Sequence, residues 1–268
     1  MIPVSWLSKY LYCPRQLWLE QIKGIKSEEN AKMVAGSIVH KLLSKVYKAQ
    51  VGILDATTKE MTEENFKEAF VKKFLSESQE IIVKNLTKLK QFQLSPVELF
   101  DKYVQMLRSL AYMKAKEAYA FASTFHLYGE ELTDNYFPKY QADVYLESNN
   151  LELKGSIDII EIFKEERVPM ELKTSTPPSN GAWDTDQIQL AAYIILLAET
   201  EEVTKGSIMY INHNKRVPVV INDFLRDRVF SIRDNILKLI ETKVEPQLPE
   251  TKDRCKKCSF KKECYNHS

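Results

Sequence analysis

The sequence lacks any hydrophobic run long enough to cross a membrane. Its longest apolar segment, LAAYIILLA at residues 190–198, is far shorter than a transmembrane helix. The first residues, MIPVSWLSKYLY, include Lys9 and have neither the apolar core nor the cleavage site of a signal peptide. Internal repeats and low-complexity segments are also absent. These absences predict a cytoplasmic protein without a membrane partner.

The sequence also has no large excess of either charge, and it has few cysteines. With 38 basic and 37 acidic side chains, the formal net charge is +1, so an anionic partner must be bound by a local patch. The chain has 268 residues, of which 44% are hydrophobic, enough for one elaborated domain or two small ones. Its four cysteines are Cys13, Cys255, Cys258 and Cys264. In a reducing compartment, this clustering indicates a metal site rather than disulfides.

Hydrophobic periodicity predicts helices in the first half of the chain and strands in much of the second. Residues 3–24 and most of 58–125 have helical spacing, and Pro96 should end one helix and start another. A further helix begins near Ser27, its expected N-cap. From about residue 138 to 174 the period is two, which predicts three strands. The remaining predicted elements are a helix at 184–199, a hairpin at 205–222 and a helix at 223–243.

The segment GSIDIIEIFKEERVPMELKT, residues 155–174, is typical of a β-hairpin but carries charges inside its apolar runs. Asp158 interrupts the first run, and Glu171 and Lys173 alternate with apolar residues in the second. One interpretation is an ion pair in which Lys173 neutralises a carboxylate, because buried carboxylates need a partner. The other is a functional site, favoured by Gly155, which permits close approach of a backbone or ligand.

Residues outside the hairpin also favour a functional site. Gln189 and Tyr193 are four residues apart, so they lie on one face of the helix that follows. His40 lies on the inward face of an earlier predicted helix, and Gly36, one turn before it, would let that helix pack closely.

Four motifs in this order resemble the PD-(D/E)xK nucleases of the RecB type. They are GSIVH ending at His40, GSIDII with Asp158, ELK with Glu171 and Lys173, and QLAAY with Gln189 and Tyr193. The resemblance implies an α/β fold with a restriction-endonuclease-like mixed β-sheet core flanked by helices. It also implies metal-dependent hydrolysis of DNA by an exonuclease acting on single-stranded ends.

The resemblance further implies a set of metal ligands. Asp158 and Glu171 would supply carboxylates, since hard divalent cations take oxygen ligands. The backbone carbonyl of Leu172 and the imidazole of His40 would complete the ligand set, and the imidazole suits Mn²⁺ somewhat better than Mg²⁺.

The remaining motif residues would act beside the metal. Lys173 would orient the attacking water or stabilise the charge that develops on the phosphate. Gln189 and Tyr193 would either donate hydrogen bonds to phosphate or hold Lys173 in place.

The cysteine spacing C-x2-C-x5-C, together with Cys13, suits a structural zinc site or an iron–sulfur cluster, and spacing alone leaves both open. However, YLYCPRQLWL and CKKCSFKKEC resemble the iron–sulfur subgroup of RecB-type nucleases, and most closely the CRISPR-associated exonucleases of the spacer-acquisition machinery. This resemblance implies CRISPR integrase partners and a [4Fe-4S] cluster that ties the chain ends together. Its ligands would be Cys13, Cys255, Cys258 and Cys264.

The chain departs from the compact CRISPR-associated members by a helical stretch at about 55–130, between His40 and Asp158. Repair nucleases of the exonuclease V and AddB types also carry elaborate helical regions, so a stand-alone repair exonuclease is an alternative. A catalytically silent DNA-end-binding adaptation subunit is another. We expect four segments: N-terminal helices at 1–50, a helical insertion at 51–135, a nuclease core at 136–245 and an iron–sulfur segment at 246–268.

Three groups of residues are candidates for contact with DNA. The basic tail TKDRCKKCSFKKEC, residues 251–264, either binds phosphate or is solvated. The same alternatives apply to lysines of the insertion, namely Lys72, Lys73, Lys84, Lys88 and Lys90. Four aromatic residues either stack on bases or belong to the core, which we favour: Trp6, Tyr10, Tyr12 and Trp18.

Overall fold

The computed structural model describes residues 1–248 and 254–266. Residues 251–253 of the basic tail therefore lie outside the described residues. Contacts divide the chain into two compact units. Unit 1 comprises Met1–Glu28, Val144–Ile157 and Arg167–Ser268, and unit 2 comprises Glu29–Asp143 and Asp158–Glu166. This division follows contact density, and the four segments expected from the sequence stay a prediction.

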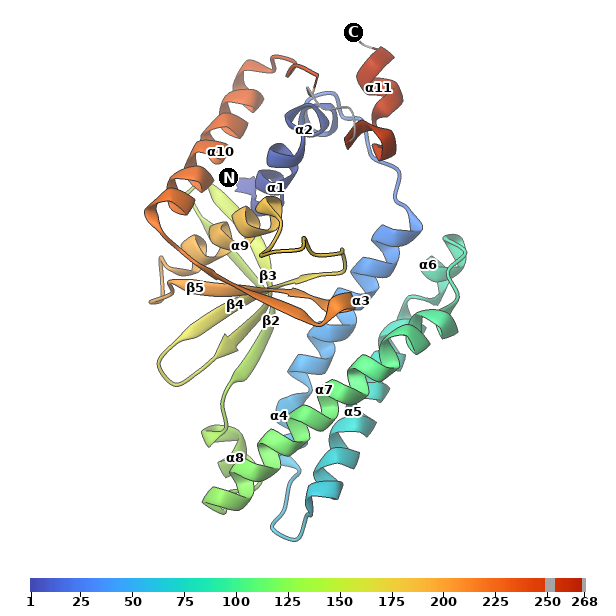
Figure 1. The fold of residues 1–268 in the computed structure, drawn as a ribbon, viewed down its shortest axis with the longest axis vertical. Helices are drawn as coiled ribbons and strands as arrows, with labels where there is room; N and C mark the ends of the chain where they lie inside the picture. The colour runs from blue at the N-terminus through green and yellow to red at the C-terminus, as the bar shows by residue number, and fades with distance from the viewer. Residues whose placement is uncertain (249–253, 267–268) are drawn as a thin grey trace. The chain divides into compact units, whose positions relative to one another are not determined.

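The chain contains a six-stranded mixed sheet in the order β1-β3-β4-β5-β6, with β2 paired to β3 (Figure 1). The strands are β1 (Ile2–Pro3), β2 (Lys139–Ser148), β3 (Leu153–Ile162), β4 (Arg167–Lys173), β5 (Lys205–Tyr210) and β6 (Lys215–Val220). Strands β4 and β5 are parallel, with Lys173 opposite Tyr210, whereas β5 and β6 are antiparallel. The mixed sheet flanked by helices, as predicted from the sequence, is confirmed.

Strand β4 lies at the centre of unit 1. Its residues from Val168 to Leu172 are all buried, as expected for a parallel strand covered on both faces. The neighbouring strand approaches very closely at Gly206, where a Cβ atom would lie 2.7 Å from the carbonyl oxygen of Pro169. Glycine in this strand therefore reflects close backbone approach.

In the described part of unit 1 the α-helices are α1 (Val4–Tyr12), α2 (Pro14–Gln21), α9 (Asp184–Leu197), α10 (Asp223–Thr242) and α11 (Lys261–Asn266). Helix α9 packs against β4, β5, α1 and α10. Because these elements cover nearly all of the helix surface, apolar residues occupy nearly all of its faces. The helical structure expected at 3–24 is found as two helices. They are separated at Cys13, because Pro14 starts a new helix at its first position.

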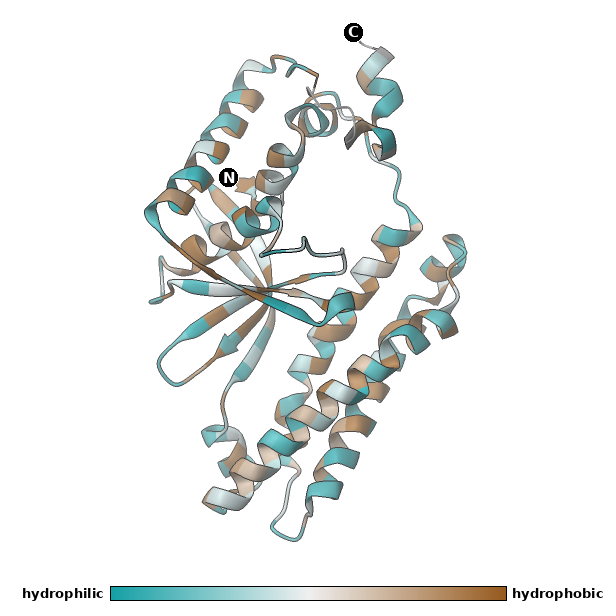
Figure 2. Ribbon diagram, in the orientation of Figure 1, coloured by the Kyte–Doolittle hydropathy of each residue, from teal (hydrophilic) through white to brown (hydrophobic). Residues whose placement is uncertain are grey.

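Unit 2 is mostly helical, with α3 (Ala31–Lys48), α4 (Gln50–Asp55), α5 (Glu63–Lys84), α6 (Leu86–Gln91), α7 (Pro96–Phe125) and α8 (Glu130–Asn135). Helices α5 and α7 pack side by side, and both alternate hydrophobic and hydrophilic residues along their length (Figure 2). The helix start predicted at Pro96 is confirmed. The N-cap predicted at Ser27 is wrong, since the side chain of Asn30 accepts the backbone hydrogen bond of Met33 instead. Nothing among the helices in the described ranges is long and apolar enough to span a membrane.

Candidate functional site

Strand β4 and helix α9 bring three of the predicted residues into one hydrogen-bonded network in unit 1. The Nζ atom of Lys173 lies 3.0 Å from Oε1 of Glu171, and it donates to Oε1 of Gln189 at 2.8 Å. The amide of Gln189 donates in turn to Oε1 of Glu171 at 2.7 Å. The ion-pair interpretation of Lys173 and Glu171 is therefore confirmed. Gln189 joins the pair, so the two interpretations do not exclude one another.

The charged groups of this network are largely buried, which strengthens the interactions between them. The side chain of Glu171 is 5% exposed and that of Lys173 is 18% exposed, although the two residues end a strand that leads to the protein surface. Because they are two residues apart on a strand, both side chains lie on the same face of the sheet. A buried carboxylate needs charge-assisted partners, and Lys173 and Gln189 supply them.

Two residues that sequence reasoning missed extend the network. One carboxylate oxygen of Asp186 lies 3.5 Å from Nζ of Lys173, and the other accepts a hydrogen bond from the hydroxyl of Tyr210 at 2.8 Å. Burial raises the pKa of Tyr210 to about 12, so the hydroxyl keeps its proton and donates. Asp186 precedes Gln189 by three residues on α9. That spacing, which puts both side chains on one helix face, is the signal that would have found it.

Tyr193 lies elsewhere on the same helix and packs on the sheet. A Cβ atom at Gly155 would lie 2.7 Å from Cε1 of the Tyr193 ring, and the tyrosine is 5% exposed. Gly155 is therefore closely approached by a side chain, the Tyr193 ring, and not by the backbone or ligand that was expected. The phosphate-contacting role of Tyr193 stays a prediction.

Unit 2 holds the other two predicted side chains, on α3 and β3. The Nδ1 atom of His40 lies 3.2 Å from Oδ1 of Asp158, although the residues are 118 positions apart in the chain. Their side chains are 31% and 21% exposed. An imidazole nitrogen and a carboxylate oxygen this close together could occupy adjacent positions around one divalent cation.

The predicted residues thus form two sets, one in each unit. Asp158 directly follows Ile157, the residue at which β3 passes from unit 1 to unit 2. The donor types of the two sets, carboxylates and an imidazole, fit a divalent cation. Within residues 1–248 and 254–266, no three His, Cys, Asp or Glu side chains are arranged as a group that could hold a metal ion.

All four cysteines line one cavity of unit 1, together with apolar residues such as Leu19 and Phe260. Cys13 lies between α1 and α2, Cys255 in a short 3-10 helix (Arg254–Lys257) and Cys264 in α11. None of the four, all within the described part of the chain, forms a disulfide. Burial raises the pKa of the Cys258 and Cys264 thiols. Four sulfur donors around one cavity fit a thiolate-bound metal or cluster, although the thiols do not form a closed ligand shell.

The aromatic residues near Cys13 divide between core and surface. Trp18 is 3% exposed and packs with Leu19, Phe260 and Cys264, so its predicted place in the core is confirmed. Tyr12 is 43% exposed, so the prediction that it belongs to the core is wrong.

Comparison with known proteins adds three findings. The family model of the PD-(D/E)XK nuclease superfamily matches residues 2–265. Two relatives, from Leptospira interrogans and Geobacter sulfurreducens, are each described as a CRISPR-associated exonuclease Cas4/endonuclease Cas1 fusion. Both are 28% identical, over 123 and 120 residues, which is 44% of this chain in each case. The match spans only 23% and 22% of those relatives' own lengths.

Among solved structures, the crystal structure of SSO0001 matches with a TM-score of 0.33 and 18% sequence identity. The match covers 61% of this chain and 77% of that one.

Proposed function

The chain belongs to the PD-(D/E)XK nuclease superfamily, and we propose that it is a divalent-metal-dependent deoxyribonuclease that degrades single-stranded DNA from its ends. The observation that carries this proposal is the network of Glu171, Lys173 and Gln189 on β4 and α9. A superfamily of nucleases supports phosphodiester hydrolysis, and the network supports an intact catalytic set rather than a silent subunit.

In this proposal, four groups hold Mg²⁺ or Mn²⁺: the carboxylates of Asp158 and Glu171, the backbone carbonyl of Leu172 and the imidazole of His40. A bound cation would supply Lewis-acid stabilisation of the charge on the phosphoryl oxygens. That both sets serve one phosphate rests on the order of the motifs in the sequence.

The other polar residues act on water and phosphate. The ammonium of Lys173 orients the attacking water or stabilises the charge that develops on a phosphate oxygen. Gln189 holds Lys173 and Glu171 in position through one hydrogen bond to each. Tyr193, on the same helix, donates a hydrogen bond to phosphate or supports Lys173.

The two relatives support a role in CRISPR spacer acquisition. In both, a CRISPR-associated exonuclease is fused to the endonuclease Cas1. We propose that this chain likewise processes DNA before its integration and acts together with CRISPR integrase proteins. The four cysteines around one cavity support a [4Fe-4S] cluster bound by Cys13, Cys255, Cys258 and Cys264.

The test uses purified protein and end-labelled linear single-stranded DNA. We expect degradation in Mg²⁺ or Mn²⁺ that stops with EDTA. Glu171→Gln should lower the rate about a hundredfold or more, because a carboxylate ligand of the proposed metal ion is lost. The matched control is Glu165→Gln, since Glu165 is an exposed residue of the loop between β3 and β4. It should cleave at the wild-type rate.

Two outcomes would contradict the proposal. Full activity of Glu171→Gln would remove the assigned metal site. Circular and linear single strands cut at equal rates would remove the requirement for a DNA end.

A further inference from the structure

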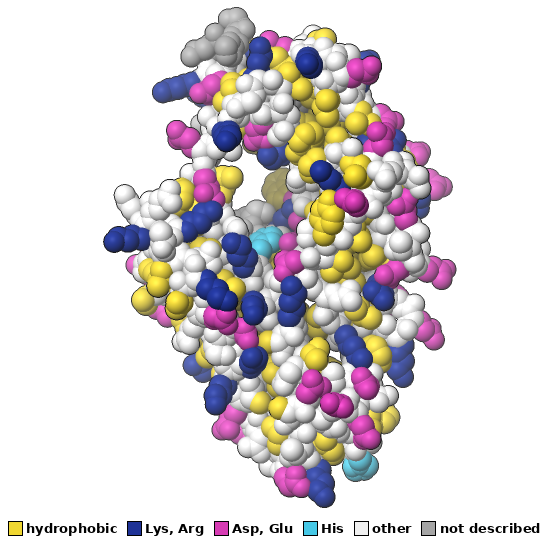
Figure 3. Space-filling view, turned by 180° about the vertical axis from the view of Figure 1, so that it is seen from behind, with side chains coloured by type: hydrophobic (Ala, Val, Ile, Leu, Met, Phe, Trp, Pro, Cys, Tyr) yellow, Lys and Arg dark blue, Asp and Glu magenta, His cyan; other side chains and the backbone are white. Residues whose placement is uncertain are grey.

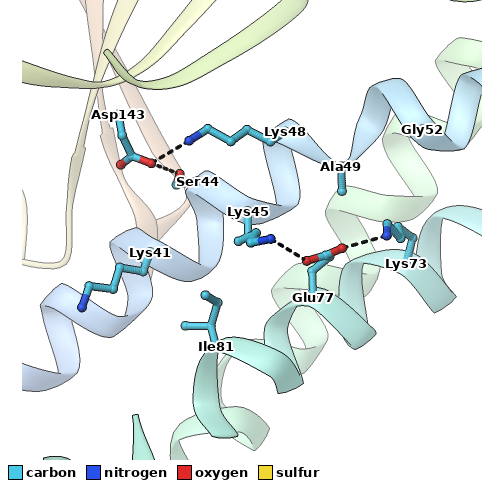
Figure 4. A pocket seen from close by; sticks show the side chains of 10 residues that line it. All are labelled: Lys41, Ser44, Lys45, Lys48, Ala49, Gly52, Lys73, Glu77, Ile81 and Asp143. Atoms are coloured by element: carbon cyan, nitrogen blue, oxygen red, sulfur yellow. Dashed lines mark hydrogen bonds and ion pairs between the residues drawn. The ribbon is translucent and has the colours of Figure 1, made fainter. Parts of the chain in front are cut away.

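Unit 2 carries a groove of about 610 Å³ that none of the roles above uses. It lies between helices α3 and α5, and the first half of β2 closes one side (Figure 4). Its charged lining consists of four lysines and two carboxylates: Lys41, Lys45, Lys48, Lys73, Glu77 and Asp143. The groove therefore has an excess of positive charge in a chain that is nearly neutral overall.

The lysines of α3 form a row along the groove. Lys41, Lys45 and Lys48 are spaced by four and three residues, so they lie on one helix face. Lys45, Lys48 and Lys73 have side chains that are 43%, 47% and 45% exposed, so their ammonium groups are accessible to a ligand. Figure 3 shows Lys and Arg side chains gathered over α3 and α5 on the face of unit 2 that it presents.

The two carboxylates hold most of these lysines in place. Glu77, whose side chain is only 12% exposed, lies 2.7 Å from Nζ of Lys73 and 3.5 Å from Nζ of Lys45. Asp143 lies 2.9 Å from Nζ of Lys48 and accepts a hydrogen bond from the hydroxyl of Ser44. Two carboxylates thus serve three ammonium groups.

Asp143 has an unusual backbone for a residue in a strand. Its φ is 57°, in the left-handed region that costs a non-glycine residue about 1 kcal/mol or more. Burial raises its pKa, but the hydrogen bonds from Ser44 and Lys48 outweigh burial and hold the pKa below its usual range. Asp143 therefore stays ionised and keeps Lys48 at the groove.

Bridges between α3 and α5 explain part of this arrangement without any ligand. Lys45, Lys73 and Glu77 join the two helices, and such contacts stabilise helix pairs modestly. They do not account for Lys41, which has no acidic partner among the described residues. Nor do they account for the groove itself, which is left open beside them.

The groove also begins next to a residue of the proposed metal site within the same unit. Lys41 follows His40 in the chain, and Ser44 lies one helical turn after His40 on α3. His40 in turn contacts Asp158. A polyanion bound along the row of lysines would therefore run toward this pair.

We propose that the groove binds the sugar–phosphate backbone of the single DNA strand that enters the cleavage site. This rests on the proposed function, because it identifies the path of that function's substrate. Three ammonium groups in a row on α3, with that of Lys73 on α5, complement a chain of phosphates. The groove lining has no aromatic side chain on which a base could stack. The contact is thus with the backbone and independent of base sequence.

The lysines that carry this proposal are mostly not those that the sequence indicated. Of the five candidates in the insertion, only Lys73 lines the groove. Lys84 and Lys88 are in ion pairs with Glu80 and Glu29. The row of lysines on α3 was missed because its helical spacing was used only to place His40 on the inward face, and the charged face of the same helix was not considered.

The test measures binding of a fluorescent single-stranded oligonucleotide by anisotropy, in EDTA so that no cleavage occurs, over a range of salt concentrations. Lys41→Ala/Lys48→Ala removes one lysine without a partner and one in an ion pair. Because each phosphate contact contributes about 0.7 to the slope of log K against log salt, the slope should fall by about 1.4. Affinity at 0.1 M salt should fall roughly tenfold or more, equally for oligonucleotides of different sequence.

The matched control is Lys67→Ala/Lys116→Ala, on α5 and α7 outside the groove. It also removes one lysine in an ion pair and one with no acidic partner among the described residues. It should keep the wild-type affinity and slope. If the first double variant does not fold, Lys41→Glu against Lys116→Glu gives the same comparison at two exposed helical positions.

Equal affinity and slope for the groove and control variants would overturn the groove proposal. If the wild-type protein cleaves DNA in Mg²⁺ in that case, the proposed function stands without it. Conversely, wild-type protein that binds through the groove lysines but cleaves nothing in Mg²⁺ or Mn²⁺ would contradict the proposed function and support the groove.

Discussion

The ammonium group of Lys173 contacts three side chains, and each has a different role. Glu171 is a proposed metal ligand, and Gln189 bridges Lys173 and Glu171. Asp186 contacts Lys173 from the opposite end of the network and is itself anchored by Tyr210. Asp186 is therefore a positioning residue, because its carboxylate holds the direction of the Lys173 ammonium when Glu171 binds the metal ion.

Asp186→Asn tests this role at the residue scale. Asparagine keeps an oxygen to accept the hydrogen bond of Tyr210, and it keeps the shape, but it removes the charge that faces Lys173. We expect kcat for DNA cleavage to fall about tenfold to a hundredfold, the range typical of residues that orient a metal site. KM and the unfolding temperature should stay near those of the wild type.

Two companion variants separate charge from packing. Asp186→Glu should restore part of the lost kcat, because a carboxylate again faces Lys173. Tyr210→Phe keeps the charge and removes only the anchoring hydroxyl, so its effect on kcat should be smaller. If Asp186→Asn cleaves DNA as fast as the wild type, Asp186 serves the fold alone.

At the scale of elements, a bidentate ion pair links the start of α9 to α10. The guanidinium of Arg228 donates to both carboxylate oxygens of Asp184, at 2.6 and 2.7 Å. The hydrogen bond from Arg228 holds the pKa of Asp184 below its usual range. Since α9 carries Gln189 and Asp186, this pair helps to fix the helix that presents them.

The Asp184–Arg228 pair makes a prediction about pH. A carboxyl group with a lowered folded-state pKa stabilises the fold above its unfolded pKa of about 3.9, and that contribution is lost as the pH falls through the folded value. Asp184→Asn should therefore lower the free energy of unfolding at pH 7 by less than about 1 kcal/mol, because the carboxylate is 54% exposed. The difference from the wild type should be smaller at pH 3 than at pH 7.

Urea unfolding at both pH values measures this difference. The control is Asp234→Asn, because Asp234 pairs with its neighbour Arg233 on the same helix and links no elements. A loss in Asp184→Asn that is the same at pH 3 and pH 7 would mean that the ion pair is not its source.

Elements with a strong period were predictable, whereas their ends and some partners were not. The alternation in β2 to β4 and the apolar run of α9 determine where those elements lie. Ser27 and Asn30 are both good N-caps, and only the local backbone decides in favour of Asn30. Asp186 and Lys41 are ordinary charged residues in a helix. The importance of Asp186 depends on its contact with Lys173, on the neighbouring strand β4, and that of Lys41 on a groove that α5 and β2 complete.

At the scale of the whole chain, residues near the beginning and the end of the sequence contact one another in unit 1. Arg15, which is 5% exposed, donates to the carbonyls of Pro246 and Cys264 at 2.8 and 3.1 Å. Trp18 donates to the carbonyl of Lys243 at 2.9 Å. These contacts place Cys13 in the same cavity as the C-terminal cysteines. A cluster bound there would therefore reinforce an existing junction.

This organisation predicts what removal of the cluster should do. Protein purified without oxygen should be brown, with about four iron and four sulfide per chain. Cys13→Ser should lose the colour and the iron, and its unfolding temperature should fall by several degrees. The protein should still fold, because Arg15 and Trp18 hold the same junction.

The control is Ser259→Ala, a change of similar size beside Cys258, which should keep both the iron and the stability of the wild type. Stoichiometric zinc without iron in the wild-type protein would show that the four thiolates bind a different metal, and the loss of stability in Cys13→Ser would then follow the zinc.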